Sequence, residues 1–121
     1  FFAINGGHSL CTLDFLYGHC ILPAKEFERY IREIRPEEEK IDLNFYRKCL
    51  NRATMADIRN MVSKYDLEIV HYGGVSSSGL DTGKWGLRIK DEFLPEVKLV
   101  YPSVTAEDLL WDSVQLILRK K

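Results

Sequence analysis

The sequence predicts a mixed α/β fold that is mainly helical and contains one antiparallel pair of strands. Two observations predict this class. Apolar residues recur at helical spacing in several segments, and two short segments, residues 67–72 and 113–119, have the composition or alternation of strands. A predicted helix also leads directly into the first strand, which is the order found in α/β half-units.

The first predicted helix lies between Pro23 and Pro36. Proline is favoured in the first turn of a helix, and a helix usually ends before a later proline. The apolar side chains between them have the i, i+3, i+4, i+7 spacing of one helix face: Phe27, Tyr30, Ile31 and Ile34. The acidic run PEEEK at 36–40 indicates a solvated connector.

A second helical pattern begins at about Ile41. It places apolar side chains on two adjoining faces, with Ile41, Phe45 and Cys49 on one and Leu43, Tyr46 and Leu50 on the other. Free cysteines rank among the most buried residues. We therefore expect Cys49 to be buried and unreactive.

Two capping patterns mark further helices. Thr54 and Asp57 have the spacing of a capping box, in which a hydroxyl and a carboxylate satisfy free backbone N–H groups at a helix start. They predict a helix over 55–65, leading into the strand LEIVHY at 67–72. Thr105 and Asp108 offer the same cap to a short helix before the last strand.

The strand LEIVHY has apolar side chains on both faces, which is typical of a strand covered on both sides. Two strands alone are only marginally stable in water. Either the chain completes its sheet with another copy, or residues 1–121 are the end of a larger α/β domain. The sequence therefore predicts one domain that is partial.

Five glycines and three serines make residues 73–86 a loop by composition. The segment does not fit a Walker phosphate loop, because Ser78 stands at the first glycine position and Trp85 follows the lysine. It does not fit a dinucleotide fingerprint either. Residues 87–102 contain two prolines and receive no assignment.

Composition narrows the class of partner. The chain has 17 Lys and Arg against 18 Asp and Glu, spread along its length, so no basic stripe predicts nucleic-acid binding. The apolar run from Leu10 to Pro23 is too short and too interrupted to span a membrane. Three cysteines without a CxxC pattern favour a reducing compartment, and we expect a cytoplasmic protein.

The opening stretch, residues 1–23, allows three interpretations: a metal site, a lid over a binding site, or plain core. A zinc site would use four candidates, His8, Cys11, His19 and Cys20. Adjacent His19 and Cys20 would point to different sides of a regular element, which disfavours zinc, and we predict no metal. As a lid, the stretch has an apolar face, with His8 beside two flexible glycines.

The chain resembles the C-terminal half of class I S-adenosylmethionine-dependent methyltransferases, type 11-like. The resemblance is carried by GGH at 6–8, ILP at 21–23, LNRATMADIRNMVSKYDLEIVHY at 50–72 and DSVQLILRKK at 112–121. It implies the C-terminal portion of a Rossmann-like fold. Residues 1–54 would then form a helical, lid-like segment, and residues 55–121 a helix-strand-loop-strand unit whose last strand returns antiparallel.

The resemblance also implies a function. The cofactor S-adenosylmethionine would be bound mainly by an N-terminal half encoded upstream, so this chain alone would be inactive and would supply the small-molecule substrate side. Gly7, His8, Tyr17 and Arg52 would bind the substrate, and His8 would be the catalytic residue that accepts its proton. The alternative from another class is a non-enzymatic interaction module that forms a homodimer.

Overall fold

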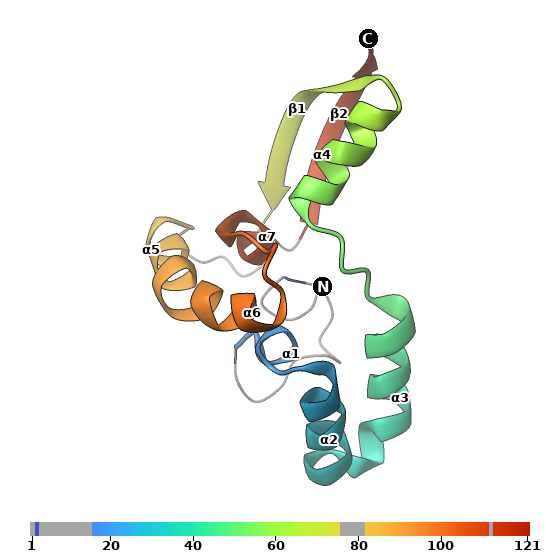
Figure 1. Ribbon diagram of the computed structural model, residues 1–121, viewed down its shortest axis with the longest axis vertical. Helices are drawn as coiled ribbons and strands as arrows, with labels where there is room; N and C mark the ends of the chain where they lie inside the picture. Colours follow the sequence, from blue (N-terminus) through green and yellow to red (C-terminus); the bar gives the residue numbers. More distant parts are fainter. Residues whose placement is uncertain (1, 3–15, 76–81, 112) are drawn as a thin grey trace.

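The computed structural model describes residues 2, 16–75, 82–111 and 113–121 (Figure 1). Strands β1 and β2 lie with helix α4 at one end of the molecule, and helices α2 and α3 lie at the other. We call the first group, together with α7, the ribbon end. The elements are α1 (Gly18–Ile21), α2 (Ala24–Ile34), η2 (Pro36–Glu38), α3 (Glu39–Asn44), η3 (Phe45–Cys49), α4 (Met55–Lys64), β1 (Leu67–Val75), α5 (Thr82–Arg88), η4 (Ile89–Phe93), α6 (Leu94–Val100), α7 (Ala106–Leu110) and β2 (Ser113–Lys120).

The predicted mixed α/β class with an antiparallel pair of strands is confirmed. Strand β1 pairs with β2 from Leu67 opposite Lys120 to Val75 opposite Ser113, with an irregularity between Ile69 and His71. In the described part of the chain the sheet has these two strands alone. Helix α4 packs against β1.

The other face of the ribbon is uncovered in the described structure. Val70, Val75 and Ile117 are 47%, 43% and 59% exposed. The sequence predicts that LEIVHY is covered on both faces, but within the described residues one face of this strand is exposed. Apolar side chains on such a face ordinarily need a further layer of structure, because burial of apolar surface is the main driving force for packing.

Helices α2 and α3 form a second unit with its own small core, which we call the hairpin and which includes η2 and η3. The core consists of Phe27, Ile31, Leu43 and Tyr46. The rings of Phe27 and Tyr46 stack with their centroids 4.0 Å apart. The predicted helix over 24–34 is confirmed.

Two expectations for the second helix are wrong. Cys49 is exposed, and Ile41 is 60% exposed. Since the Tyr46 ring turns inward to stack on Phe27, α3 presents its other predicted apolar face to α2 and leaves Ile41 outside. The acidic run is not a plain connector either, because η2 and the start of α3 are formed from it.

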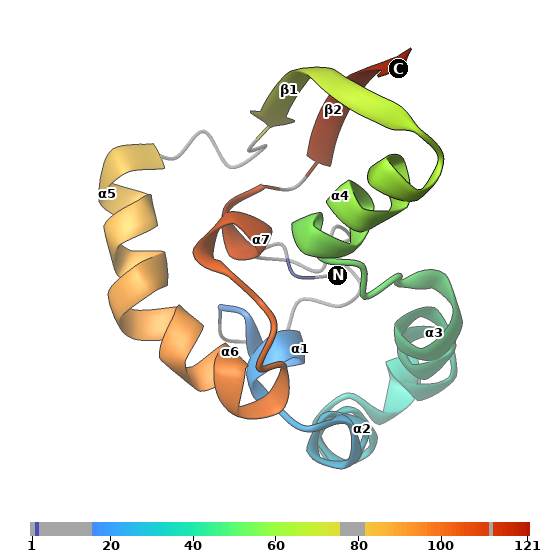
Figure 2. The same cartoon turned by 45° about the horizontal axis from the view of Figure 1, so that its top comes forward.

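The second apolar cluster fills the middle of the molecule. Its buried members are Phe2, Tyr17, Cys20, Ile89, Val97, Val104 and Leu109. The segments α5, η4 and α6 run on from one another as a single curved helical stretch around this cluster (Figure 2). The loop predicted for residues 73–86 is wrong at both of its described ends, because β1 continues to Val75 and α5 begins at Thr82. Residues 87–102, which the sequence left unassigned, are helical as far as Val100, and Pro95 lies in the first turn of α6, where no N–H is required.

Both predicted capping boxes are confirmed, and one of them links two helices. The Asp57 carboxylate accepts a hydrogen bond from the backbone N–H of Thr54 at 2.8 Å. Asp108 does the same for Thr105, and its second oxygen accepts a bond from the N–H of Met55 at 2.7 Å. One carboxylate thus joins the N-termini of α4 and α7.

Within the described ranges, no helix is long and apolar enough to cross a membrane.

Candidate functional site

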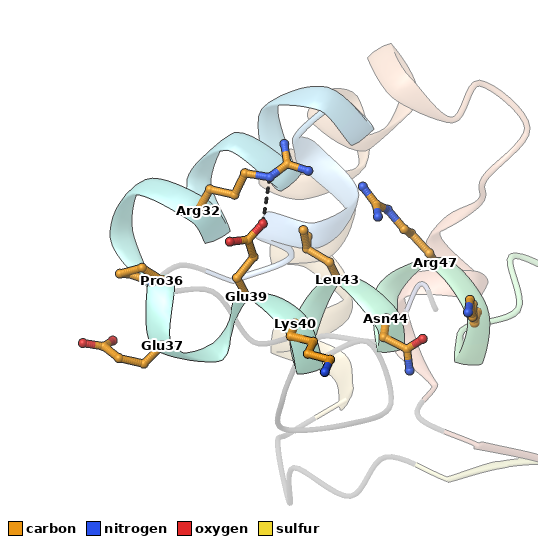
Figure 3. Close-up of a pocket in the computed structure, with 9 residues that line it drawn as sticks. Arg32, Pro36, Glu37, Glu39, Lys40, Leu43, Asn44 and Arg47 are labelled. Carbon is orange, nitrogen blue, oxygen red and sulfur yellow. Dashed lines mark hydrogen bonds and ion pairs between the residues drawn. The ribbon is translucent and has the colours of Figure 1, made fainter.

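The clearest hollow among the described residues lies on the hairpin, between α2, η2 and α3 (Figure 3). Its volume is about 520 Å³. Four basic side chains, two acidic ones and three others line it: Arg32, Lys40, Arg47, Lys48, Glu37, Glu39, Pro36, Leu43 and Asn44. The lining is therefore more basic than acidic.

Two of the arginines are held in place by carboxylates. Arg47 Nε donates to Glu28 at 2.8 Å, and Arg32 Nε donates to Glu39 at 3.0 Å. Arg32 Nη2 also reaches Glu28 at 3.3 Å, so Glu28 bridges both guanidinium groups. The hydrogen bond from Arg47 is the main reason that the pKa of Glu28 is lowered. The network therefore ties η3 to α2 across the hollow.

Lys40 and Lys48 supply the remaining positive charge. Neither has an ion pair with any described residue. In Figure 3, Lys40 and Asn44 extend from the side of α3 opposite to Glu39 and Arg32. There they border a second hollow of about 610 Å³ that Ile41 and Phe45 complete. The surface offers a positive rim beside apolar side chains, which suits an anionic group attached to an apolar body.

Two of the predicted site residues, Gly7 and His8, lie outside the described residues. Tyr17 lies in the central cluster, where its side chain is fully buried and its hydroxyl donates to the Leu109 carbonyl at 2.7 Å. Its φ of 57° is in the left-handed region, which is uncommon for a tyrosine. The role of Tyr17 in substrate binding stays a prediction that requires this buried ring to become accessible.

Arg52 lies in the irregular segment that follows η3, remote in sequence from Tyr17. Its guanidinium stands 4.9 Å from the centre of the Tyr46 ring and donates to the backbone carbonyls of Tyr46 and Leu50 at 3.1 and 3.3 Å. Carbonyls in the last turn of a helix have no intrahelical partner. Arg52 therefore caps the C-terminal end of the hairpin's second helix, and substrate binding by its exposed side stays a prediction.

The candidate metal ligands of the opening stretch are only partly described. His19 and Cys20 both lie in α1, and both are buried. Burial raises the pKa of the Cys20 thiol far above its ordinary value, which opposes the thiolate that a zinc site needs. Among the described residues no group of three or more His, Cys, Asp or Glu side chains could hold a metal ion.

Comparison with known proteins adds no relative. No protein family, no curated protein and no solved structure matches the chain. The methyltransferase resemblance therefore rests on the residues quoted for it.

Sequence reasoning missed the basic hollow. The Glu28–Arg32 pair is visible in the sequence as an i, i+4 pair on a helix. The contact of Arg47 with Glu28 is not visible, because it depends on how α3 and η3 fold back on α2.

Proposed function

We propose that the chain is the substrate-side, C-terminal part of an S-adenosylmethionine-dependent methyltransferase. One observation carries the proposal: helix α4 enters β1, and the last strand, β2, returns antiparallel beside it. This is the order that the resemblance implies for the end of the family's fold. The uncovered ribbon face would then be covered by the remainder of the sheet and its helices.

The residues of this chain do not fit the cofactor. The family's glycine-rich turn and acidic ribose ligand are absent from the sequence. Of the two glycines that follow LEIVHY directly, Gly74 has a packing role, because a Cβ there would come within 2.2 Å of the Trp111 ring. We therefore assign no residue here to S-adenosylmethionine and derive no step through it.

The contribution of this chain would be to hold the methyl acceptor. Methyl transfer depends mostly on alignment of the acceptor with the methyl group, and a general base helps only if the acceptor must lose a proton. The hairpin, with its basic hollow, would form the cover of the acceptor site. His8 remains the proposed proton acceptor.

The test is to sequence the gene upstream of Phe1 and to produce the protein of the complete reading frame. We expect an upstream strand, a glycine-rich turn and a helix, and binding of S-adenosylmethionine by equilibrium dialysis. The 121-residue chain, dialysed in parallel, should not bind it. A complete protein without such a turn, and without binding, would exclude a methyltransferase.

A second candidate function is a dimerising interaction module, and the uncovered ribbon face favours it. Val70 and Ile117 lie close together on that face, since Ile117 pairs with His71 beside the strand irregularity. Two copies could bury these side chains against each other. Sedimentation should then show a dimer that I117K dissociates and that L99K, a lysine at the 79% exposed Leu99 of α6, leaves intact. A monomer at tens of micromolar would contradict this function.

A further inference from the structure

One acidic side chain is buried in the hairpin without a hydrogen bond. Asp42 is 0% exposed, on the inner face of α3 beside Leu43. Among the described residues, neither of its carboxylate oxygens has a hydrogen-bond donor. A buried ionised carboxylate without donors is strongly unfavourable, because it gives up its hydration and gains nothing in return. An ionised Asp42 would therefore need a nearby cation to offset the free-energy cost of its burial.

Among the described residues, the cation that is ion-paired with Asp42 is shared with a second carboxylate. Arg35, at the end of α2, places Nη1 3.7 Å from Asp42 Oδ2, too far for a good hydrogen bond. The other terminal nitrogen of Arg35 is paired with Glu38 of η2. One guanidinium therefore faces two carboxylates, and the negative charge at this corner exceeds the positive charge.

The burial of Asp42 and its neighbour Glu38 outweigh Arg35 and favour a neutral carboxyl. Burial is the main reason that the pKa of Asp42 is raised; Arg35 lowers it and Glu38 raises it further. Tyr46, in η3 directly after α3, stays neutral because burial raises the pKa of its hydroxyl. Glu28 and Arg32 of α2 are engaged with Arg47 and Glu39 around the basic hollow.

We propose that Asp42 is the proton-binding site of a pH-operated switch in the hairpin. With a proton on Asp42, the carboxyl is neutral, it can donate to Glu38, and α3 packs on α2 through Leu43 and Tyr46. When the proton leaves to solvent, the Asp42 carboxylate turns toward water and α3 loosens from α2. The switch concerns the hairpin alone and does not depend on the activity that the chain supports.

The direction of the pH dependence follows from the raised pKa. The unfolded chain ionises Asp42 near the usual value of about 3.9, whereas the folded chain does so at higher pH. The stability contributed by protonated Asp42 is therefore complete below about pH 4. It is lost as pH rises and is gone above the folded-state pKa.

The experiment is a pH titration of the full chain by two methods. The first follows the side-chain carboxyl ¹³C signal of Asp42 by NMR, and we expect a midpoint above the usual aspartate value. The second compares wild type with Asp42→Asn, which carries no charge at any pH. We expect D42N to melt several degrees above wild type at pH 8, with the difference closing toward pH 4, and to show stronger amide-exchange protection in α3 at pH 8.

The matched control is Glu37→Gln, which removes the same charge from an exposed neighbour in η2 and should leave melting and exchange unchanged. An Asp42 midpoint at or below the usual aspartate value would overturn the proposal. So would a D42N protein that melts below wild type throughout the pH range. The NMR midpoint decides the matter on the wild-type chain even if D42N does not fold.

Discussion

The two ends of the molecule use aspartate in opposite ways. At the ribbon end, Asp57 and Asp108 stand at the N-termini of α4 and α7 and accept hydrogen bonds from backbone N–H groups. In the hairpin, Asp42 also stands in the first turn of its helix, α3, but both of its oxygens are buried without a hydrogen-bond donor among the described residues. Aspartate carboxylates therefore stabilise the ribbon end, whereas an ionised Asp42 carboxylate opposes folding of the hairpin.

The difference comes from whether the carboxylate reaches the free donors of its helix. The first four N–H groups of a helix have no intrahelical partner, so a carboxylate that reaches them receives bonds and also meets the positive end of the helix dipole. Asp57 and Asp108 reach these groups through capping boxes, whereas Asp42 receives no such bond in the described structure. Asp42 depends instead on a neighbouring cation, and Arg35 serves Asp42 and Glu38 together.

The largest effect is expected from Phe27→Ala, which tests whether the two ends unfold together. Phe27 is fully buried in a four-residue core and stacks on Tyr46. Its loss should cost about 3 to 5 kcal/mol. Native-state hydrogen exchange should show protection lost in α2 and α3 while β1 and β2 keep theirs. Equal loss in both ends would show that hairpin and ribbon form one cooperative unit.

Asp108→Ala should have the next largest effect, at the other end. Its carboxylate caps α7 through Thr105 and also holds the Met55 N–H of α4. Because one cap is worth about 0.5 to 2 kcal/mol, loss of both should cost about 1 to 4 kcal/mol in chemical denaturation. Glu96→Gln, which changes an exposed carboxylate of α6 and keeps both caps, serves as the control. Glu107 is unsuitable as a control because it forms an ion pair with Arg59 of α4. A loss no greater than that of E96Q would mean that the two Asp108 caps carry no stability.

These two ends also differ in how far the sequence predicted them. At the ribbon end, the hydroxyl and carboxylate of each capping box stand three residues apart, so the caps could be predicted from local spacing. The two strands could be predicted from their local composition and alternation. The link from Asp108 to Met55 joins residues distant in the sequence and could not be predicted from it. In the hairpin, periodicity gave two candidate apolar faces for the second helix. Only the stacking of Tyr46 on Phe27 decides between them.

The candidate site was the least predictable part. The hollow on the hairpin depends on Arg47 reaching Glu28 across two helices, and nothing in the local sequence indicates that contact. Arg52 was predicted from a motif, but its contacts with carbonyls at the end of η3 follow from the chain's turn after Leu50. Asp42 looks in sequence like any polar residue on a helix surface, and its burial follows from the helix's rotation.

Asp57→Ala should have the smallest effect on stability. It sharpens the comparison because the pH dependence of its melting difference from wild type should have the opposite sign to that of D42N. Hydrogen bonds from the Thr54 backbone and hydroxyl lower the pKa of Asp57. Its stabilisation is therefore present above the usual aspartate pKa of about 3.9 and is lost as pH falls through the lowered folded-state value. D57A should melt below wild type at pH 7, and the gap should narrow in acid, whereas the gap for D42N opens as pH rises. Parallel pH profiles for the two variants would mean that hydrogen-bond donors do not distinguish these carboxylates, and the contrast between the two ends would fail.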